Sequence, residues 1–255
     1  MHTAHISAMA QPAGGPRCAR YAAPSEMRRV ALADLLREIG RPIASHEGRR
    51  TRLDLLRSSG SGDVFVYCVG DAAILNQPTV SIVGTREVSS NGWQRAARIA
   101  RELAAQRVVV MSGLARGVDT AALSAALRAN GQVVGIIGTP VNKAYPAENA
   151  ALQQEIYTKQ LLISPFANDE RVLKANFPKR NRMMALLSDA TVIVEASDTS
   201  GTLHQAAECQ YQGRWLFILR SVADNTSLTW PARFIGKDKV RVVENITDIM
   251  DAIAR

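Results

Sequence analysis

A short basic segment, FPKRNR at residues 177–182, has the residue types of an anion-binding site. Proline fixes its own φ near the helical value and has no amide hydrogen, so Pro178 predicts the first turn of a helix. The free amides of that turn carry the positive end of the helix dipole, and Lys179, Arg180 and Arg182 add formal charge beside them. The segment therefore predicts a site for a phosphate-sized anion, although a basic run that stands alone is usually a solvated helix start.

Glycine-containing turns follow several apolar runs and could lie beside this segment. Residues 79–83 and 108–111 predict strands, and each is followed by a turn that contains glycine and arginine; a further polar turn follows the strand expected at 191–194. Because ligands bind outside the carboxyl ends of parallel strands, these turns would converge on one edge of a sheet. The residues expected to contact phosphate groups are Gly84, Thr85, Arg86, Ser112, Gly113, Arg116, Lys179, Arg180, Asn181, Arg182, Ser200, Gly201 and Thr202.

Strand-like and helix-like segments alternate through most of the chain. Helical spacing of apolar residues over 93–106 and 119–129 follows the first two strands, and Asp119 is the expected N-cap of the second helix. Further strands are expected at 133–137, 161–163, 191–194, 216–219 and 240–243, and a last helix at 245–254. Continuous apolar runs between helices predict an α/β fold: a Rossmann-like doubly wound, mainly parallel sheet with helices on both faces.

The first sixty residues are expected to be organised differently. Residues 1–24 are rich in Ala, Gly and Pro and lack the apolar core of a secretion signal, which predicts a disordered leader. Residues 25–60 predict a short helical segment, with one helix from Ser25 to Gly40 and a second over 51–57. Residues 61–255 form the expected Rossmann-like domain.

Composition narrows the class of protein. The 255 residues are 47% hydrophobic without a long unbroken apolar stretch, so no membrane span is expected. The three cysteines, Cys18, Cys68 and Cys209, have no metal-ligand spacing and are interpreted as reduced thiols of a cytoplasmic protein, with no metal or cofactor. The 31 Lys and Arg against 23 Asp and Glu give a formal charge of +8, which favours an anionic partner.

Five separated motifs, in this order, resemble the DprA/Smf family (DNA-processing protein A). They are GTR at 84–86, SGLARGVD at 112–119, GT at 138–139 with YPAEN at 145–149, FPKRNR at 177–182, and Glu195 with SGTL at 200–203. The resemblance runs from about Val64 to about Leu219. It implies a non-enzymatic protein that binds single-stranded DNA in a basic pocket, protects it, forms homodimers and assists loading of a RecA-type recombinase in recombination or natural transformation.

The chain departs from the family pattern at Leu123, Pro140, His204 and Arg220, and a winged-helix tail is not recognisable. These departures predict a modified pocket, and they leave a role in recombination or mobile-element defence open beside one in transformation. Within the expected pocket, Gly84, Gly113 and Gly201 would let backbone amides approach the strand. Tyr145 and Phe177 are candidates for base stacking, with packing in the core or rim as the alternative.

Two other functions belong to the same fold class: a sensor that binds a nucleotide, and a LOG-like nucleotide phosphoribohydrolase. The hydrolases resemble this chain at the glycine–threonine turn but carry a glutamate three residues after the threonine. Gln205 stands at that spacing here and cannot ionise. Glu208 is expected on the surface, and Glu195 is expected to accept hydrogen bonds from loop amides or to pair with an arginine.

Overall fold

The protein is described by a computed structural model that covers residues 21–41, 56 and 63–253. Within these residues nine strands form one sheet in the order β1-β2-β6-β5-β4-β3-β7-β8-β9. The strands are β1 (Arg28–Ala31), β2 (Phe65–Gly70), β3 (Thr79–Gly84), β4 (Val109–Ser112), β5 (Val133–Ile136), β6 (Leu161–Ser164), β7 (Ala190–Glu195), β8 (Trp215–Leu219) and β9 (Val240–Val243). Neighbours from β6 to β9 pair in parallel, whereas β1 and β2 are antiparallel at one edge.

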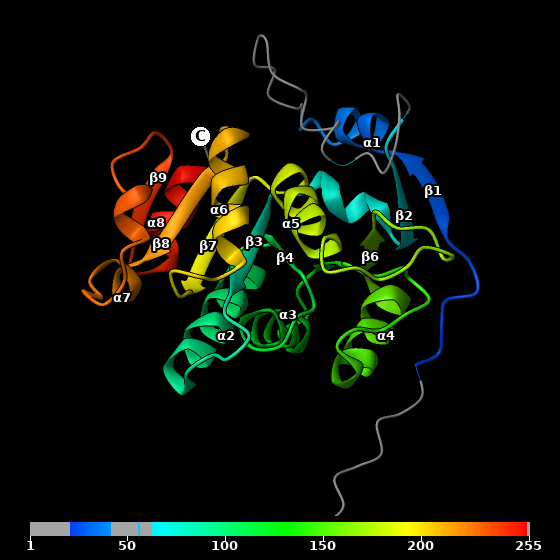
Figure 1. Cartoon of the computed structure of the whole chain (residues 1–255), viewed down its shortest axis with the longest axis horizontal. Coiled ribbons are helices and arrows are strands. Elements are labelled where there is room, and N and C mark those ends of the chain that lie inside the picture. The colour runs from blue at the N-terminus through cyan, green and yellow to red at the C-terminus, as the bar shows by residue number, and fades with distance from the viewer. Residues whose placement is uncertain (1–20, 42–55, 57–62, 254–255) are drawn as a thin grey trace, which may run out of the picture.

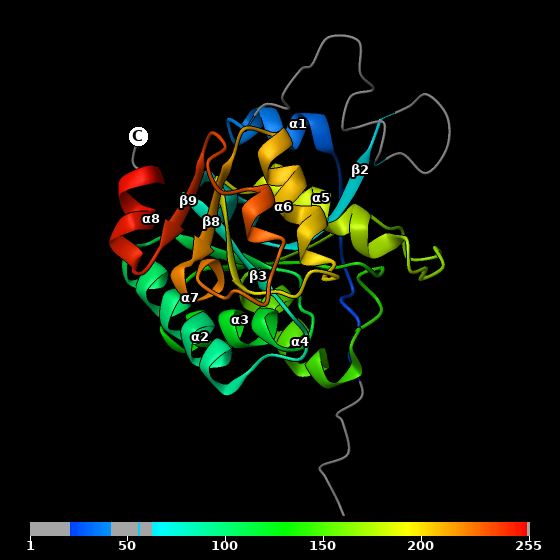
Figure 2. The same cartoon turned by 60° about the vertical axis from the view of Figure 1, so that its left-hand side comes forward.

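Helices cover both faces of the sheet (Figures 1 and 2): α2, α3 and α4 lie on one side, and α1, α5 and α6 on the other. The helices are α1 (Leu32–Glu38), α2 (Ser90–Ala105), α3 (Val118–Arg128), α4 (Ala150–Lys159), α5 (Asn176–Leu187), α6 (Thr202–Tyr211), α7 (Arg220–Ala223) and α8 (Ile246–Ile253). Short 3₁₀ turns occupy Ala72–Asn76, Ala147–Asn149 and Pro231–Arg233. The predicted Rossmann-like, mainly parallel architecture is confirmed.

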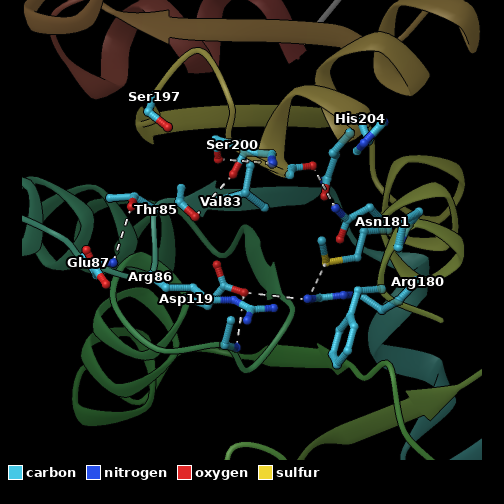
Figure 3. A pocket seen from close by; sticks show the side chains of 18 residues that line it. Val83, Thr85, Arg86, Glu87, Asp119, Arg180, Asn181, Ser197, Ser200 and His204 are labelled. Atoms are coloured by element: carbon cyan, nitrogen blue, oxygen red, sulfur yellow. Dashed lines mark hydrogen bonds and ion pairs between the residues drawn. The ribbon is translucent and has the colours of Figure 1, made fainter. Parts of the chain in front are cut away.

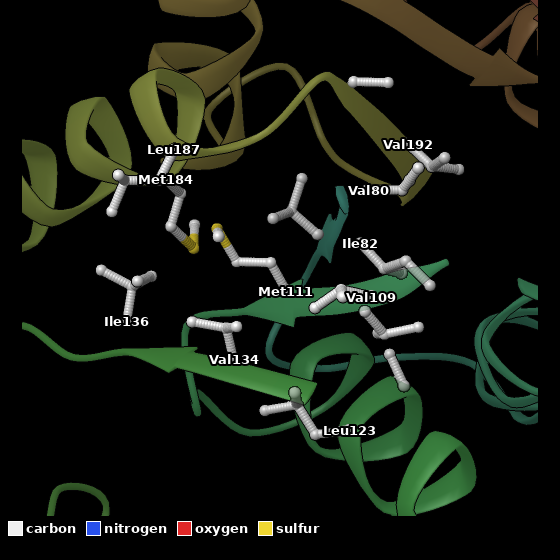
Figure 4. Close-up of a cluster of buried hydrophobic side chains, with 14 of the residues drawn as sticks. Val80, Ile82, Val109, Met111, Leu123, Val134, Ile136, Met184, Leu187 and Val192 are labelled. Atoms are coloured by element: carbon white, nitrogen blue, oxygen red, sulfur yellow. The ribbon is translucent and has the colours of Figure 1, made fainter. Parts of the chain in front are cut away.

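The central strands are buried on both faces, which explains their continuous apolar sequences. Figure 4 shows Val80, Ile82, Val109 and Met111 of β3 and β4 between helices on either side. Met184 and Leu187 of α5 pack from one side and Leu123 of α3 from the other, and all seven of these side chains are 0–1% exposed. Neither face of these strands meets water. The part of the sheet that solvent can reach is therefore the edge at which the strands end.

The amino-terminal segment departs from the prediction. The helix expected from Ser25 is wrong for residues 25–31, of which 28–31 form the edge strand β1 and pair with β2. The helix begins at Leu32, whose stripe with Leu35 and Leu36 is buried as expected. Arg28 and Arg29 are exposed, so β1 lacks the apolar run by which a strand is predicted. The predicted helix at 51–57 lies outside the described residues apart from Leu56, and the division of the chain at residue 60 stays a prediction.

Tyr21 and Ala22 pack against the domain, so the disorder predicted up to Pro24 is wrong for these two residues. The Tyr21 hydroxyl donates to the Val141 carbonyl at 2.6 Å and accepts from Gln153 at 2.9 Å. Burial raises the pKa of Tyr21 to about 12. The Ala22 carbonyl accepts from the Tyr157 hydroxyl at 2.7 Å. Residues 1–20 of the expected leader lie outside the described residues.

A buried arginine ties the segment after α1 to the amino ends of β3 and β7. Arg41 is 4% exposed, and its Nε and Nη2 donate to the two carboxylate oxygens of Asp189, each at 2.8 Å. Its Nη1 donates to the Leu75 carbonyl at 2.9 Å. Asp189 also accepts from the amide of Thr79, the first residue of β3, at 2.8 Å. The bidentate pair therefore fixes the start of the β3–β7 pair from outside the sheet.

We expect Arg41→Ala to lower the free energy of unfolding by about 3 kcal/mol, because it removes the buried guanidinium that donates to Asp189 and to the carbonyls of Leu75 and Gln77. That figure is the lower end for breaking a buried ion pair, since the Asp189 side chain is 34% exposed. Urea unfolding followed by circular dichroism measures the change. The matched control is Arg37→Ala, which removes an exposed ion pair to Asp34 and should cost about 0–1 kcal/mol. Equal losses for the two variants would contradict the assigned role of Arg41.

Candidate nucleic-acid interface

Two adjoining cavities lie where β3, β4 and β7 end. Cavity A, of about 320 Å³, is bounded by the end of β3, the first turn of α5 and the first turn of α6, and includes Thr85, Asn181 and Gln205 (Figure 3). Cavity B, of about 280 Å³, is bounded by the loop after β4 and includes Arg116 and Tyr145. The two cavities share the lining residues Arg86, Glu87, Ala115, Phe177 and Arg180.

Most of the residues predicted to contact phosphate meet here. Ten of the thirteen line one or both cavities: Gly84, Thr85, Arg86, Gly113, Arg116, Arg180, Asn181, Ser200, Gly201 and Thr202. Ser112, Lys179 and Arg182 line neither. The predicted convergence of separate turns on one sheet edge is therefore present, with three residues placed elsewhere.

Arg180 forms the floor between the cavities instead of projecting into solvent. It is 5% exposed, and its Nη1 lies 3.6 Å from Asp119 Oδ2 and 3.9 Å from Met184 Sδ (Figure 3). Its Nε has no hydrogen-bond partner among the described residues. Burial lowers the pKa of the guanidinium, and the neighbouring Asp119 carboxylate opposes that shift. The prediction that three cations of α5 all face outward is wrong for Arg180.

Asp119 is the buried partner of Arg180 and not the helix cap that we predicted. The cap position of α3 is Gly117, which has no side chain to donate or accept. The Asp119 carboxylate instead accepts from the Gly113 amide at 3.1 Å and the Ala115 amide at 3.3 Å. Burial raises the pKa of this carboxyl, while Arg180 and the two amides lower it. Asp119 thus holds the loop after β4 against the first turn of α5.

Gly113 is required by the same contact. A Cβ atom at this position would overlap Nη1 of Arg180, so the guanidinium can cross the backbone only where a side chain is absent. The amide of Gly113 is already donated to Asp119. The expectation that Gly113 presents its amide to a bound strand is therefore wrong. Gly201 differs, because a Cβ there would meet nothing within 4 Å.

Arg86 is an exposed cation at the boundary of the two cavities. Its Cζ lies 5.4 Å from the centroid of the Phe177 ring, and no ion pair of Arg86 occurs among the described residues. The Phe177 ring is 5.5 Å from that of Tyr145, which is 49% exposed. An uncompensated guanidinium beside two aromatic rings has the chemistry of a phosphate and base contact.

Two of the other predicted cations, Arg116 and Arg182, have ion-pair partners. Arg116 pairs with Glu148, with Nη2 3.2 Å from Oε2, in an exposed ion pair. The Nε of Arg182 lies 3.8 Å from Oε2 of Glu208. Glu208 is 4% exposed, so its predicted surface location is wrong. Lys179 is half-buried and lies outside both cavities.

The polar turn before α6 is fixed by contacts with α5 and β3. The Thr202 hydroxyl donates to the Gly84 carbonyl at 3.2 Å. The side-chain Nδ2 of Asn181 donates to the Gly201 carbonyl, also at 3.2 Å. Ser112, by contrast, is fully buried and donates its hydroxyl to the Ile82 carbonyl at 2.7 Å. The prediction that Ser112 contacts phosphate is wrong, because its hydroxyl serves the sheet.

Glu195 and Gln205 are the positions at which an acid or base group would be expected in a hydrolase of this fold class. Glu195 accepts from the amide of Ser89 at 3.0 Å and from its hydroxyl at 2.6 Å, which confirms the predicted role as an acceptor for a loop amide. Gln205 lies in the wall of cavity A, is 0% exposed and donates to Thr191 Oγ1 at 3.3 Å.

Glu87 and Ser197 also line cavity A, and the sequence analysis did not identify them. Both follow strand ends, which is the signal that could have identified them.

The described residues contain no group of three or more His, Cys, Asp or Glu that could hold a metal ion. Cys68 and Cys209 are buried free thiols, and burial raises their pKa to about 11 and about 12. None of the helices in the described ranges is long and apolar enough to cross a membrane.

These features define a Rossmann-like domain with a groove lined by arginines at the carboxyl edge of its sheet. Residues 54–254 match the family described as DNA recombination-mediator protein A, and the chain belongs to that family. The DprA/Smf resemblance inferred from the motifs is thereby confirmed.

Individual relatives agree with this assignment. The chain is 35% identical to DNA processing protein DprA of Streptococcus pneumoniae over 165 residues, or 64% of this chain and 58% of the relative. It is 32% identical to protein Smf of Escherichia coli over 180 residues, or 70% of this chain and 48% of the relative. The chain thus spans about half the length of these relatives.

Solved structures show the same fold. DprA of Streptococcus pneumoniae superposes with a TM-score of 0.65 at 30% identity, covering 73% of this chain and 65% of that one. DprA of Helicobacter pylori, whose structure was determined for its single-stranded DNA binding mode, gives a TM-score of 0.67 at 28% identity. That comparison covers 83% of this chain and 95% of the other.

We expect Gly113→Ala to lower the free energy of unfolding by about 1–3 kcal/mol, because the new methyl group displaces the buried Arg180 guanidinium. Urea unfolding measures the loss. Gly201→Ala is the matched control and should change stability by less than about 0.5 kcal/mol, since its methyl group enters open space. If Gly113→Ala were as stable as Gly201→Ala, Arg180 would not pass over residue 113.

Proposed function

We propose that this protein binds single-stranded DNA across cavities A and B without cleaving it, and that it protects the strand during recombination or transformation. The observation that carries the proposal is Arg86, an exposed guanidinium that lines both cavities and has no ion-pair partner in the described part of the chain. The single-stranded DNA binding named for the Helicobacter pylori relative supports the same ligand class. So does the formal charge of +8.

Phosphate binding at this groove begins with Arg86. The buried Arg180 lies close enough for the two charges to interact, since Arg86 contributes to the lowered pKa of the Arg180 guanidinium. A phosphate between them relieves that repulsion. Arg116 also contacts phosphate, by exchanging its ion pair with Glu148 for one with the phosphate. This exchange costs little free energy, because the existing pair is exposed. Lys179 and Arg182 extend the positive surface beyond the cavities.

Uncharged donors complete the proposed contacts. Amides and hydroxyls at the turn ends approach a phosphate without adding charge, as at other glycine-rich loops. The residues assigned this role are Gly84, Thr85, Asn181, Ser200 and Gly201. Thr202 instead donates its amide to Ser200 Oγ and its hydroxyl to the Gly84 carbonyl, each at 3.2 Å. Contacts of this kind fix the path of a backbone and carry little sequence preference.

A single strand fits this groove better than a duplex. The cavities are small and recessed, and the central cation Arg180 is 5% exposed, so a phosphate must enter the groove to reach it. A flexible strand can direct one phosphate inward, whereas a duplex presents its phosphates on a broad, stiff surface. Tyr145, which is 49% exposed beside Phe177, offers a ring on which a base of that strand can stack.

Three further parts of the proposal rest on family membership. They are delivery of the bound strand to a RecA-type recombinase, action as a homodimer, and a cytoplasmic location. The family description, a recombination mediator, supports the first of these. The homodimer and the cytoplasmic location are proposed from the sequence identity of 32–35% with these relatives.

Hydrolysis of a nucleotide is disfavoured by the residues at the groove. The position of the hydrolase glutamate is Gln205, an amide that cannot transfer a proton as a carboxylic acid does. Glu195 is occupied by Ser89, and Glu208 lies buried beside Arg182. The proposed function is therefore binding and not catalysis.

We expect binding of an oligo-dT strand to weaken steeply with salt and to exceed binding of a duplex of equal length. Arg86→Ala should lower the affinity and reduce the slope of log K against log salt by about 0.7, the value for one phosphate contact on a single strand. Fluorescence anisotropy at a series of salt concentrations measures both quantities.

Arg101→Ala is the matched control, because it removes the same charge from the exposed surface of α2, away from both cavities. Its slope should equal that of the wild type. A slope that changed equally in the two variants would reflect net charge and not a groove. Failure of the wild-type protein to bind either DNA at low salt would end the proposal.

A further inference from the structure

The chain before β1 runs along α4 and contacts the loop after β5 (Figure 1). Tyr21 makes that contact: its hydroxyl donates to the Val141 carbonyl at 2.6 Å and accepts from Nε2 of Gln153 in α4 at 2.9 Å. The residues that match the family are 54–254, and Tyr21 lies outside them. The contact is therefore supplied by a part of the chain that the family match does not include.

The loop after β5, residues 137–146, forms part of the wall of cavity B with both of its ends. Gly138 lines the cavity at one end of the loop, and Tyr145 and Pro146 line it at the other. A Cβ atom at Gly138 would lie 2.8 Å from the Phe177 ring, so the first end is in close contact with that ring. The middle of the loop, residues 139–143, lines neither cavity. A contact with the middle therefore acts on the groove through the residues at the ends.

Gln153 and Tyr21 hold the middle of this loop together. Besides its bond to Tyr21, Nε2 of Gln153 donates to the Lys143 carbonyl at 3.2 Å. The Thr139 hydroxyl donates to the same carbonyl at 3.0 Å. Gln153 is 1% exposed and Thr139 is 2% exposed, so water contributes little to these contacts. The loop is thus fixed from behind by side chains of the protein.

Removal of the Tyr21 hydroxyl would release the loop at Val141. Val141 is 1% exposed, so its carbonyl would lose a donor at a place that water scarcely reaches. A buried carbonyl that loses its donor costs free energy, which favours a shift of the turn toward solvent. Only Ala144 separates Lys143 from Tyr145 in the sequence, so a shift of this turn displaces the Tyr145 backbone.

We infer that Tyr21 is a positioning residue of the groove: its hydroxyl holds the loop after β5 from behind and thereby fixes the place of the Tyr145 ring in the wall of cavity B. This inference rests on the proposed function, in which a base stacks on Tyr145, and adds to it a residue from outside the family match. The Tyr145 side chain is 49% exposed, so the position of its ring depends strongly on the backbone that carries it.

The first test observes Tyr145 in the free protein. The chain has five tyrosines, so incorporation of 3-fluorotyrosine labels five positions for ¹⁹F NMR, and the resonance lost in Tyr145→Phe belongs to residue 145. We expect Tyr21→Phe to shift this resonance, because it releases the turn before residue 145. Tyr157→Phe is the matched control: it removes the hydrogen bond to Ala22 in the same segment and leaves the Val141 contact in place. The control should leave the Tyr145 resonance unchanged.

The second test asks whether Tyr21 affects binding through Tyr145. We expect Tyr21→Phe to lower the affinity for oligo-dT by about two- to tenfold, the range of equilibrium ratios to which one hydrogen bond corresponds. Tyr145→Ala should lower it by about tenfold, as expected for the loss of a stacked base. The double variant should bind like Tyr145→Ala alone, to within about twofold, because the ring that Tyr21 positions is absent. Tyr157→Phe should bind like the wild type.

An unchanged Tyr145 resonance in Tyr21→Phe would overturn the inference. So would an affinity loss that persists in full in the double variant, because a general loss of stability acts whichever residue stands at 145. If Tyr21→Phe does not fold, Gln153→Leu serves instead: it removes the hydrogen bonds from Gln153 to Tyr21 and Lys143 and should shift the same resonance. Absence of DNA binding would end the proposed function alone, since the resonance in the free protein still decides whether Tyr21 positions Tyr145.

Discussion

The buried pair of Asp119 and Arg180 determines the form of the groove. It joins the loop after β4 to the first turn of α5, two segments that are distant in the sequence and both line the cavities. Placing two ions inside a protein is costly, and a hydrophobic pair of similar volume is often as stable. The contact therefore contributes geometry: it sets the position of the loop and leaves the guanidinium as the floor between the cavities.

The arginines at the groove are of two kinds: those paired with carboxylates of the protein, and one whose charge is available to a ligand. Arg180 is largely neutralised by Asp119, and Arg116 and Arg182 are paired with Glu148 and Glu208. Arg86 stands over Phe177 without such a partner in the described residues. A count of arginines at the groove thus overstates the unpaired charge there, because of Arg86, Arg116 and Arg180 only Arg86 has no ion-pair partner in the described residues.

Much of the fold follows from the sequence, because strands buried on both faces are continuously apolar and lie between helices of regular spacing. The edge strand β1 was missed since Arg28 and Arg29 face solvent and leave no such run. At the site, strand-end turns predicted which residues converge but not where their side chains point. Nothing near Arg180 in sequence indicates that it turns inward, because its partner Asp119 belongs to another element and Gly113, which makes room for it, to the turn after β4.

The strand pair β3–β7, which carries part of cavity A, is held at both ends by polar contacts. At its amino end Asp189 accepts from the Thr79 amide and from Arg41. At its carboxyl end the Thr85 amide donates to the Glu195 carbonyl at 2.7 Å, and the Glu195 side chain accepts from Ser89 at the start of α2. These contacts fix the positions of β3 and β7 without a contribution from the exposed residues Arg86, Ser197 and His204. Among the departures from the family pattern, His204 lines cavity A, whereas Leu123, Pro140 and Arg220 line neither cavity, so a change at residue 204 can alter the groove without loss of the fold.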